Sequence, residues 1–323
     1  MHPLSNPAAQ ATGRTAGYAT SAGWFRYALK FRGSVIPAVL DRTLVCTGFA
    51  MLIAVLHHFK LPVSLPVLAS LIPNIVLGLM LVFRTNTAYE RFWEGRKLWG
   101  GLVNATRNLA RHIWVVVPAP DPSDRQEKSA TLYLLVAFSV ATKLHLRQQP
   151  IDEELAELLS GPRYSKLKTM NNPPLEIAFW IQDYLERSYA DRRLSAYQLA
   201  TMQGLLNQLV DYLGGCERIL KTPIPMAYAI HLKQLLLIYC LTLPMQFVSQ
   251  LGWLTAPMVF LISFMLFGIE QIGIEIENPF GCDSNDLPLD QICKTMRRNV
   301  EDLMTLEPSS SQTVHISQNL ASN

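Results

Sequence analysis

Long apolar runs alternate with charged, amphipathic stretches along this chain, and the pattern predicts helices throughout. Near the N-terminus, two apolar runs cover residues 35–59 and 65–83 and are joined by a short turn that contains Pro62. Two more cover residues 232–248 and 253–274. A helix needs about 20 apolar residues to cross a bilayer. We therefore predict four transmembrane helices at these positions.

The region between the two pairs, residues 84–230, carries more charge and reads as a series of helices. Breaks rich in Pro, Asp, Ser or Asn fall at residues 118–124 and 163–174, and Gly214-Gly215 predicts a further interruption. The apolar run at residues 130–142 is too short to span a membrane, so we assign it to a buried cytosolic helix. No alternating strand pattern competes, so the predicted fold class is all-α.

The two ends of the chain have little apolar content. Residues 1–22 are small and polar, with Arg14 as the only Lys, Arg, Asp or Glu and no apolar core of a signal peptide. We expect residues 1–22 and 304–323 to be disordered tails, with a plastid transit peptide as the alternative for the first. Residues 23–303 then form one membrane domain.

Composition supports burial in lipid. The chain of 323 residues is 50% hydrophobic and only 16% charged, which is unusual for a soluble domain of this length. The net charge is +3, and the basic residues form no extended cluster, so nucleic-acid binding is not expected. The five cysteines form no CxxC pair, which argues against a zinc site or a disulfide framework.

Lys and Arg are concentrated before the first predicted span and after the second, whereas the final hairpin, VSQLGWLTAP, has no charge. Basic residues in short flanking segments mark the cytoplasmic side. We therefore place both termini and residues 84–230 in the cytoplasm. The predicted location is the cell (inner) membrane, with a thylakoid or other plastid membrane as the alternative.

Residues suited to catalysis do not gather in any recognisable motif. The sequence contains no HExxH, GxSxG, P-loop or GxGxxG, and the adjacent His57 and His58 would point to different helix faces. Glu90 and Glu94 share a helical face, but Arg91 nearby makes an ion-pair network the simpler interpretation. We predict that the protein is not an enzyme and needs no cofactor.

The second predicted span has two unlike faces at 100° per residue. Bulky apolar residues form one face: Ile72, Ile75, Val76, Leu79 and Phe83. Small or polar residues form the other: Ser70, Asn74 and Gly78. The small face favours close packing against neighbouring helices. The bulky face must contact lipid, another helix or a pore, and periodicity alone favours lipid or another helix.

Four ordered stretches then resemble motifs of the bestrophin family, in its bacterial and plastid branch. They are WFRYALKFRGSVIP (24–37), FRTNTAYERFWEGRKLWG (83–100), KTPIPMAY (221–228) and IEIENPFGCDSNDLPLDQIC (274–293). The resemblance implies a homopentameric ion channel whose central pore is lined by the second span. It assigns Ile75, Leu79 and Phe83 to a hydrophobic neck and Ile224, between Pro223 and Pro225, to a cytosolic aperture.

The same resemblance draws attention to Asp283 and Asp286. In animal bestrophins the stretch after NPFG leads into a denser acidic run that forms a calcium clasp. Here Cys282, Ser284 and Asn285 dilute the run. We therefore favour a helix end capped by Asn278-Pro279 and tied to the N-terminal segment over a cation-binding turn, and expect no resident metal.

Three functions remain to be distinguished. The favoured hypothesis, mainly from the resemblance, is a passive channel for monovalent anions such as chloride. A channel of the same build that passes cations is the second, because acidic residues lie near the membrane exit. A non-conducting membrane scaffold is the third. Reversal potentials in a salt gradient separate the first two, and the absence of current favours the third.

Overall fold

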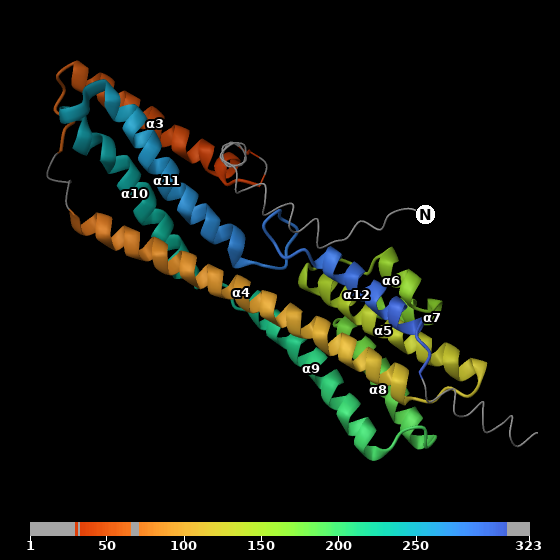
Figure 1. The fold of residues 1–323 in the computed structure, drawn as a ribbon. Helices are drawn as coiled ribbons and strands as arrows, with labels where there is room; N and C mark the ends of the chain where they lie inside the picture. The colour runs from red at the N-terminus through yellow and green to blue at the C-terminus, as the bar shows by residue number, and fades with distance from the viewer. Residues whose placement is uncertain (1–29, 32, 66–70, 309–323) are drawn as a thin grey trace, which may run out of the picture. The chain divides into compact units, whose positions relative to one another are not determined.

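The computed structural model describes residues 30–31, 33–65 and 71–308. The predicted tail at residues 1–22, residues 309–323 of the other tail and the start of the second predicted span at residues 66–70 lie outside them. Within the described residues all regular structure is helical, which confirms the predicted fold class (Figure 1). The chain divides into two compact units, Met1–Thr85 with Met226–Ile274 and Asn86–Pro225 with Glu275–Asn323.

In its described residues, the first unit contains three long apolar helices and the beginning of a fourth. These are α3 (Ile36–His58), α10 (Met226–Leu251), α11 (Thr255–Glu277, up to Ile274 in this unit) and the part of α4 (Leu71–Val116) that ends at Thr85. The short 3-10 helix η2 (Gly252–Leu254) joins α10 to α11. Gly252 has a positive φ of 51°, which a residue without a Cβ adopts easily.

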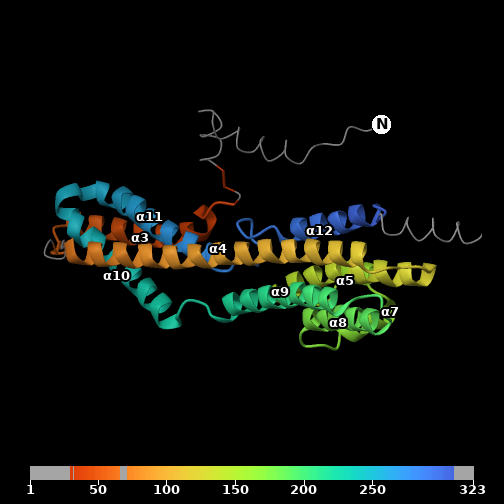
Figure 2. The same ribbon diagram turned by 60° about the horizontal axis from the view of Figure 1, so that its bottom comes forward.

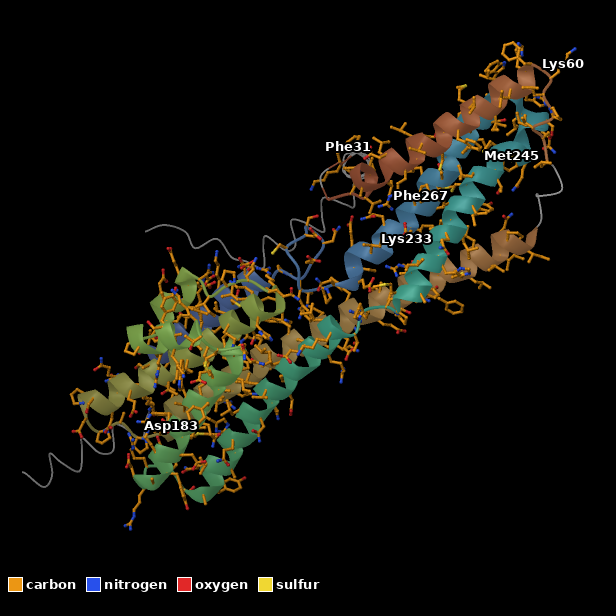
Figure 3. All side chains as sticks on the ribbon, turned by 180° about the vertical axis from the view of Figure 1, so that it is seen from behind. Phe31, Lys60, Asp183, Lys233, Met245 and Phe267 are labelled. Carbon is orange, nitrogen blue, oxygen red and sulfur yellow. The ribbon has the colours of Figure 1, made fainter. Side chains whose placement is uncertain are left out.

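Side chains from all four helices form the core of this unit. Cys46, Leu77, Leu236 and Phe267 are buried in it together, one from each helix; Phe267 of α11 is labelled in Figure 3. The turn after α3 is closed onto α10, since the Leu65 N–H donates to the Met245 carbonyl at 2.9 Å. The predicted helices at 35–59, 232–248 and 253–274 therefore correspond to α3, α10 and α11, with α10 beginning earlier than predicted.

Three described stretches are long and apolar enough to cross a membrane: Ile36–His58, Pro122–Leu146 and Met226–Glu277. The last of these, 52 residues long, comprises α10, η2 and α11. The predicted span at 65–83 is not among them, because part of it lies outside the described residues. The stretch Pro122–Leu146 is different from the other two, since 78% of its most apolar window is buried inside the protein.

That buried stretch is α5, the central helix of the second unit (Figures 1 and 2). It packs against α8 (Pro173–Ala190), α9 (Ala196–Lys221) and α12 (Leu289–Met304). The prediction that the run at 130–142 is a buried helix is thus confirmed. Its predicted length is wrong, because the helix continues for 25 residues through polar positions at both ends.

Two short helices were not predicted in this unit. They are α6 (Glu153–Leu158), whose N-cap Asp152 accepts from the Leu155 N–H, and α7 (Gly161–Leu167). Because α7 extends to Leu167, the break predicted at 163–174 is shorter than expected. The next helix, α8, starts after Asn172, whose side chain accepts from the Leu175 N–H.

Gly214 and Gly215, predicted to interrupt a helix, instead lie inside α9, and other glycines lie inside α4. A Cβ on Gly95 of α4 would stand 2.8 Å from Pro279 Cγ, and one on Gly215 of α9 would stand 2.8 Å from Leu98 Cδ2. A Cβ on Gly101 would overlap the Tyr212 ring. Here Gly permits close approach of α4 to α9 and to the NPF segment. The predicted interruption at Gly214-Gly215 is therefore wrong, and α9 continues to Lys221.

Buried charges tie α5 to its neighbours. Lys143, 3% exposed, donates to Glu154 at 2.6 Å and lies 3.0 Å from Asp290 of α12. Arg147 pairs with the same Asp290 at 2.9 Å. Burial alone would raise the pKa of Asp290, but the hydrogen bonds from Arg147 and Lys143 outweigh it and hold the pKa below its usual value. The carboxylates of Glu154 and Asp290 thus neutralise the buried ammonium group of Lys143 inside the second unit.

Candidate pore-lining site

The apolar row on α4 faces away from the core of its own unit. Ile75, Leu79 and Phe83 are 59%, 52% and 62% exposed, whereas Leu77 and Leu81 are 4% and 3% exposed. At about 100° per residue, the middle of the exposed row lies roughly 180° around the helix from the middle of the buried pair. One chain therefore packs α4 by one side and leaves the predicted neck residues uncovered on the other.

The small residues of α4 are also uncovered within a single chain. Asn74 and Gly78 are exposed, and no atom lies within 4 Å of a Cβ built on Gly78. Ile72 and Val76 are 71% and 45% exposed. Ser70 lies outside the described residues. The predicted close packing of the small face is not made inside this chain, so it stays a prediction for contacts between copies.

Polar contacts fix α4 and α3 within the first unit. The Tyr228 hydroxyl of α10 donates to the Met80 carbonyl at 2.6 Å. Arg42 of α3 lies 3.3 Å from Glu270 of α11, whose side chain is 3% exposed. The ion pair supplies the cationic partner that a buried carboxylate among apolar helices requires.

The predicted aperture residue sits in the turn of residues 222–225, between the end of α9 at Lys221 and the start of α10. Ile224 is partly buried, and its N–H donates to the Glu277 Oε1 atom at 3.0 Å. Pro223 and Pro225 restrict the backbone on either side. The turn is therefore held by a specific side-chain acceptor as well as by proline.

Arg91 of α4 is the second residue that holds this turn. Its guanidinium donates to the carbonyls of Ile219 at 2.6 Å, of Glu277 at 3.1 Å, and of Thr222. These carbonyls belong to the last turns of α9 and α11 and to the residue just after α9, where intrahelical donors run out. One planar cation thus holds the start of the turn together with Glu277, whose side chain accepts from the Ile224 N–H.

Sequence reasoning missed the roles of Arg91 and Glu277. The available signal was the position of Arg91 within ERFWEGR. From the sequence alone, Arg91 is interpreted as part of an ion-pair network with Glu90 and Glu94. That network exists in another form, since Glu94 pairs with Arg218 of α9 at 2.5 Å. Both partners of this pair are more than 40% exposed, so it contributes little compared with the Arg91 contacts.

The acidic turn after NPFG closes on itself. The Asp283 N–H donates to Asp286 Oδ2 at 2.7 Å, and the Asp286 N–H donates to the Asp283 carbonyl at 3.1 Å. Burial raises the pKa of Asp286. Across the described ranges, no three His, Cys, Asp or Glu side chains gather as metal ligands would. The cation-binding hypothesis for Asp283 and Asp286 stays untested.

The alternative interpretation of this segment, a helix end capped by Asn278-Pro279, stays a prediction, because the Asn278 side chain bonds within the turn and not to a carbonyl of α11. Helix α11 ends at Glu277, and the Asn278 side chain accepts from the Phe280 N–H at 3.3 Å. Glu275 accepts from the Asn285 amide at 2.7 Å. The predicted tie to the segment before residue 30 lies outside the described residues.

The fold and the exposed apolar helices define an α-helical membrane protein. Comparison with known families goes further, because the model of the bacterial/fungal bestrophin proteins matches residues 18–302. This chain belongs to the bestrophin family. The membership confirms both the resemblance drawn from the four motifs and the prediction that the protein is not an enzyme.

Curated relatives are similar over most of their length. A protein of Nostoc sp. named as a voltage-dependent anion channel-forming protein is 62% identical over 286 residues, covering 88% of this chain and 93% of the relative. One of the same name from Synechocystis sp. is 58% identical over 285 residues, with the same coverage. The crystal structure of a bacterial bestrophin homologue from Klebsiella pneumoniae matches with a TM-score of 0.76 at 29% identity, covering 84% of this chain and 100% of that one.

Proposed function

We propose that this chain forms a passive channel for monovalent anions such as chloride. The observation that carries the proposal is the row of Ile75, Leu79 and Phe83, left uncovered opposite the packed side of α4. The names of the curated relatives, voltage-dependent anion channel-forming proteins, support the choice of anions. Together they favour a pore over a scaffold.

The proposed assembly is a homopentamer with a central pore. Asn74 and Gly78 are exposed in one chain, and a polar amide facing hydrocarbon without a partner costs several kcal/mol. A neighbouring copy packed on that face would cover Asn74. Native mass spectrometry in mild detergent should then give the mass of five chains, and monomers alone would contradict the assembly.

In the pentamer, Ile75, Leu79 and Phe83 would form three apolar rings that make up the neck. Such rings conduct while they stay wet and block when they narrow and lose water. They carry no charge, so they gate without coordinating the ion. Ile224 would form the separate cytosolic aperture, held by Arg91 and Glu277.

The remaining parts of the proposal concern location and ions. The channel lies in the inner membrane of the cell, with a thylakoid membrane as the alternative. Both termini face the cytoplasm, because the segments that flank the apolar helices on the side of the termini are rich in Lys and Arg, which mark the cytoplasmic side. Conduction does not require calcium in this proposal, since Cys282, Ser284 and Asn285 dilute the acidic run and Asp286 Oδ2 already accepts from the Asp283 N–H.

The test is to replace Ile75, Leu79 and Phe83 together by Ala and record currents from the reconstituted protein. Smaller side chains widen the neck and keep it wet, so conductance or open probability should rise. The matched control is Ile72→Ala/Val76→Ala, which shortens apolar side chains of the same exposed helix outside the row. Unchanged currents in the triple variant would contradict the neck assignment, and an increase in the control instead would move the neck to Ile72 and Val76.

A further inference from the structure

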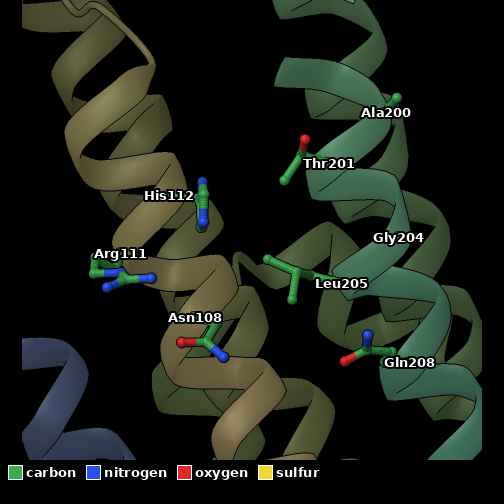
Figure 4. Close-up of a pocket in the computed structure, with 8 residues that line it drawn as sticks. All are labelled: Asn108, Arg111, His112, Ala200, Thr201, Gly204, Leu205 and Gln208. Carbon is green, nitrogen blue, oxygen red and sulfur yellow. The ribbon is translucent and has the colours of Figure 1, made fainter. Parts of the chain in front are cut away.

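A surface groove lies between the C-terminal half of α4 and the N-terminal half of α9, both within the second unit (Figure 4). Its volume is about 350 Å³, within the range of roughly 300–1,000 Å³ common for small-molecule sites. Asn108 and His112 point from α4 toward α9, while Thr201, Leu205 and Gln208 point from α9 toward α4 (Figure 4).

The geometry of the two helices explains why the groove opens here. Glycines bring α4 and α9 together at Gly101 against Tyr212 and at Leu98 against Gly215. Further along the antiparallel pair, α9 presents Gly204 instead of a side chain, and no atom lies within 4 Å of a Cβ built there. The helices remain neighbours, but side chains do not fill the space between them.

The chemistry of the lining residues is one-sided. Arg111 is a donor-only cation, His112, Asn108 and Gln208 can each donate as well as accept, and no Asp or Glu is among the described residues that line the groove. In the described part of the chain, none of these four side chains has a hydrogen bond or an ion pair with another protein group. A guanidinium, an imidazole and two amides without protein partners form a surface that accepts negative charge.

The lining also has an apolar part formed by Leu205 and Ala200 beside Gly204. We propose that this groove is a binding site for a small organic phosphate, with the oxyanion on Arg111 and an apolar body over Leu205. Arg supports this choice because its planar fork matches phosphate oxygens in a bidentate arrangement. The site is distinct from the neck and aperture residues and does not depend on conduction.

The test measures binding by calorimetry on the full-length, detergent-solubilised protein with inorganic phosphate and phenyl phosphate as probes. Sodium chloride at about 150 mM screens long-range attraction and keeps chloride sites occupied. Phenyl phosphate should bind more tightly than inorganic phosphate, because only the former covers Leu205. Arg111→Gln should weaken both probes by about tenfold or more, as expected for loss of a charge-assisted bidentate contact.

Two matched controls separate a site from general attraction. Arg107→Gln removes the same charge one turn earlier on α4, outside the groove, and should change affinity by less than about twofold. Gly204→Leu fills the groove and should weaken phenyl phosphate about tenfold, whereas Gly214→Leu on the same helix, equally open at its Cβ, should not.

Several results would overturn the proposal. These are no binding heat with either probe, equal losses for Arg111→Gln and Arg107→Gln, or no preference for phenyl phosphate over inorganic phosphate. The binding test measures no current. A negative binding result therefore does not contradict the channel proposal, and a protein that passes no current could still bind an organic phosphate in the groove.

Discussion

Replacing Arg91 by Gln should release the turn that carries Ile224. The guanidinium donates to the carbonyls of Ile219, Thr222 and Glu277, and Arg91 is itself partly buried. Hydrogen bonds to a charged donor each contribute about 1.5–3 kcal/mol. Partial exposure and lack of additivity reduce the total, so we expect a loss of about 3 kcal/mol in the free energy of unfolding.

For a chain of 323 residues, a loss of that size should lower the apparent Tm in detergent by roughly 4–5 °C. Arg91→Lys keeps the charge but not the fork, so it should recover only a minor part of the loss. The matched control is Arg96→Gln on the same helix. Arg96 is exposed and, among the described residues, has no hydrogen bond or ion pair, so its loss should shift Tm by less than about 1 °C.

The functional assay for Arg91→Gln is the relative permeability of chloride, bromide, nitrate and thiocyanate under bi-ionic conditions. A turn freed from α4 holds Ile224 less rigidly, so discrimination between anions of different size should become weaker than in wild type and in Arg96→Gln. If Arg91→Gln matches Arg96→Gln in both Tm and permeability ratios, the three carbonyl contacts do not hold the aperture and our reasoning about this turn is wrong.

Two further predictions concern single side chains. Ile224→Ala should change the permeability ratios among halides, nitrate and thiocyanate in reconstituted bilayers while leaving open probability nearly unchanged; a change confined to gating would make the turn a coupling element. Burial, with Arg125 nearby, lowers the pKa of Lys128 from 10.5 to about 8. Between these two pH values the unfolded chain binds more protons than the folded chain. The free energy of unfolding should therefore increase as the pH rises through this window, by at most about 3 kcal/mol. Thermal melts of wild type against Lys128→Met from pH 7 to 10.5 should show this rise in wild type alone, and parallel curves would refute it.

Much of the fold could be predicted from the sequence because lipid-facing helices leave a strong signal. The runs that became α3, α10 and α11 are apolar for the length of a membrane span, and little else fits such composition. The exposed row on α4 was also accessible, because a spacing of four places its members on one face. Short helices such as α6 and α7 gave too weak a pattern, because they offer only one or two turns.

The roles of individual glycines and charges could not be predicted in the same way. Gly214-Gly215 is a sequence signal for a helix end, and only the neighbouring Leu98 shows that Gly215 allows close packing instead. Arg91 reaches carbonyls 128 and 186 positions away, and the partner of Arg42 lies 228 positions away. Such pairings depend on the tertiary arrangement, which local pattern does not encode.

The sign of charge selectivity is the most direct test of the central claim that this protein is an anion channel. The purified protein would be reconstituted in a planar bilayer with a tenfold potassium chloride gradient, and the reversal potential of the current would be measured. An anion channel gives a reversal potential near the chloride equilibrium potential, which is about 59 mV in magnitude for this gradient. Its sign is opposite to that of the potassium equilibrium potential. A reversal potential near that of potassium would contradict the account in favour of a cation channel, and the absence of any current from pentameric protein would favour a scaffold.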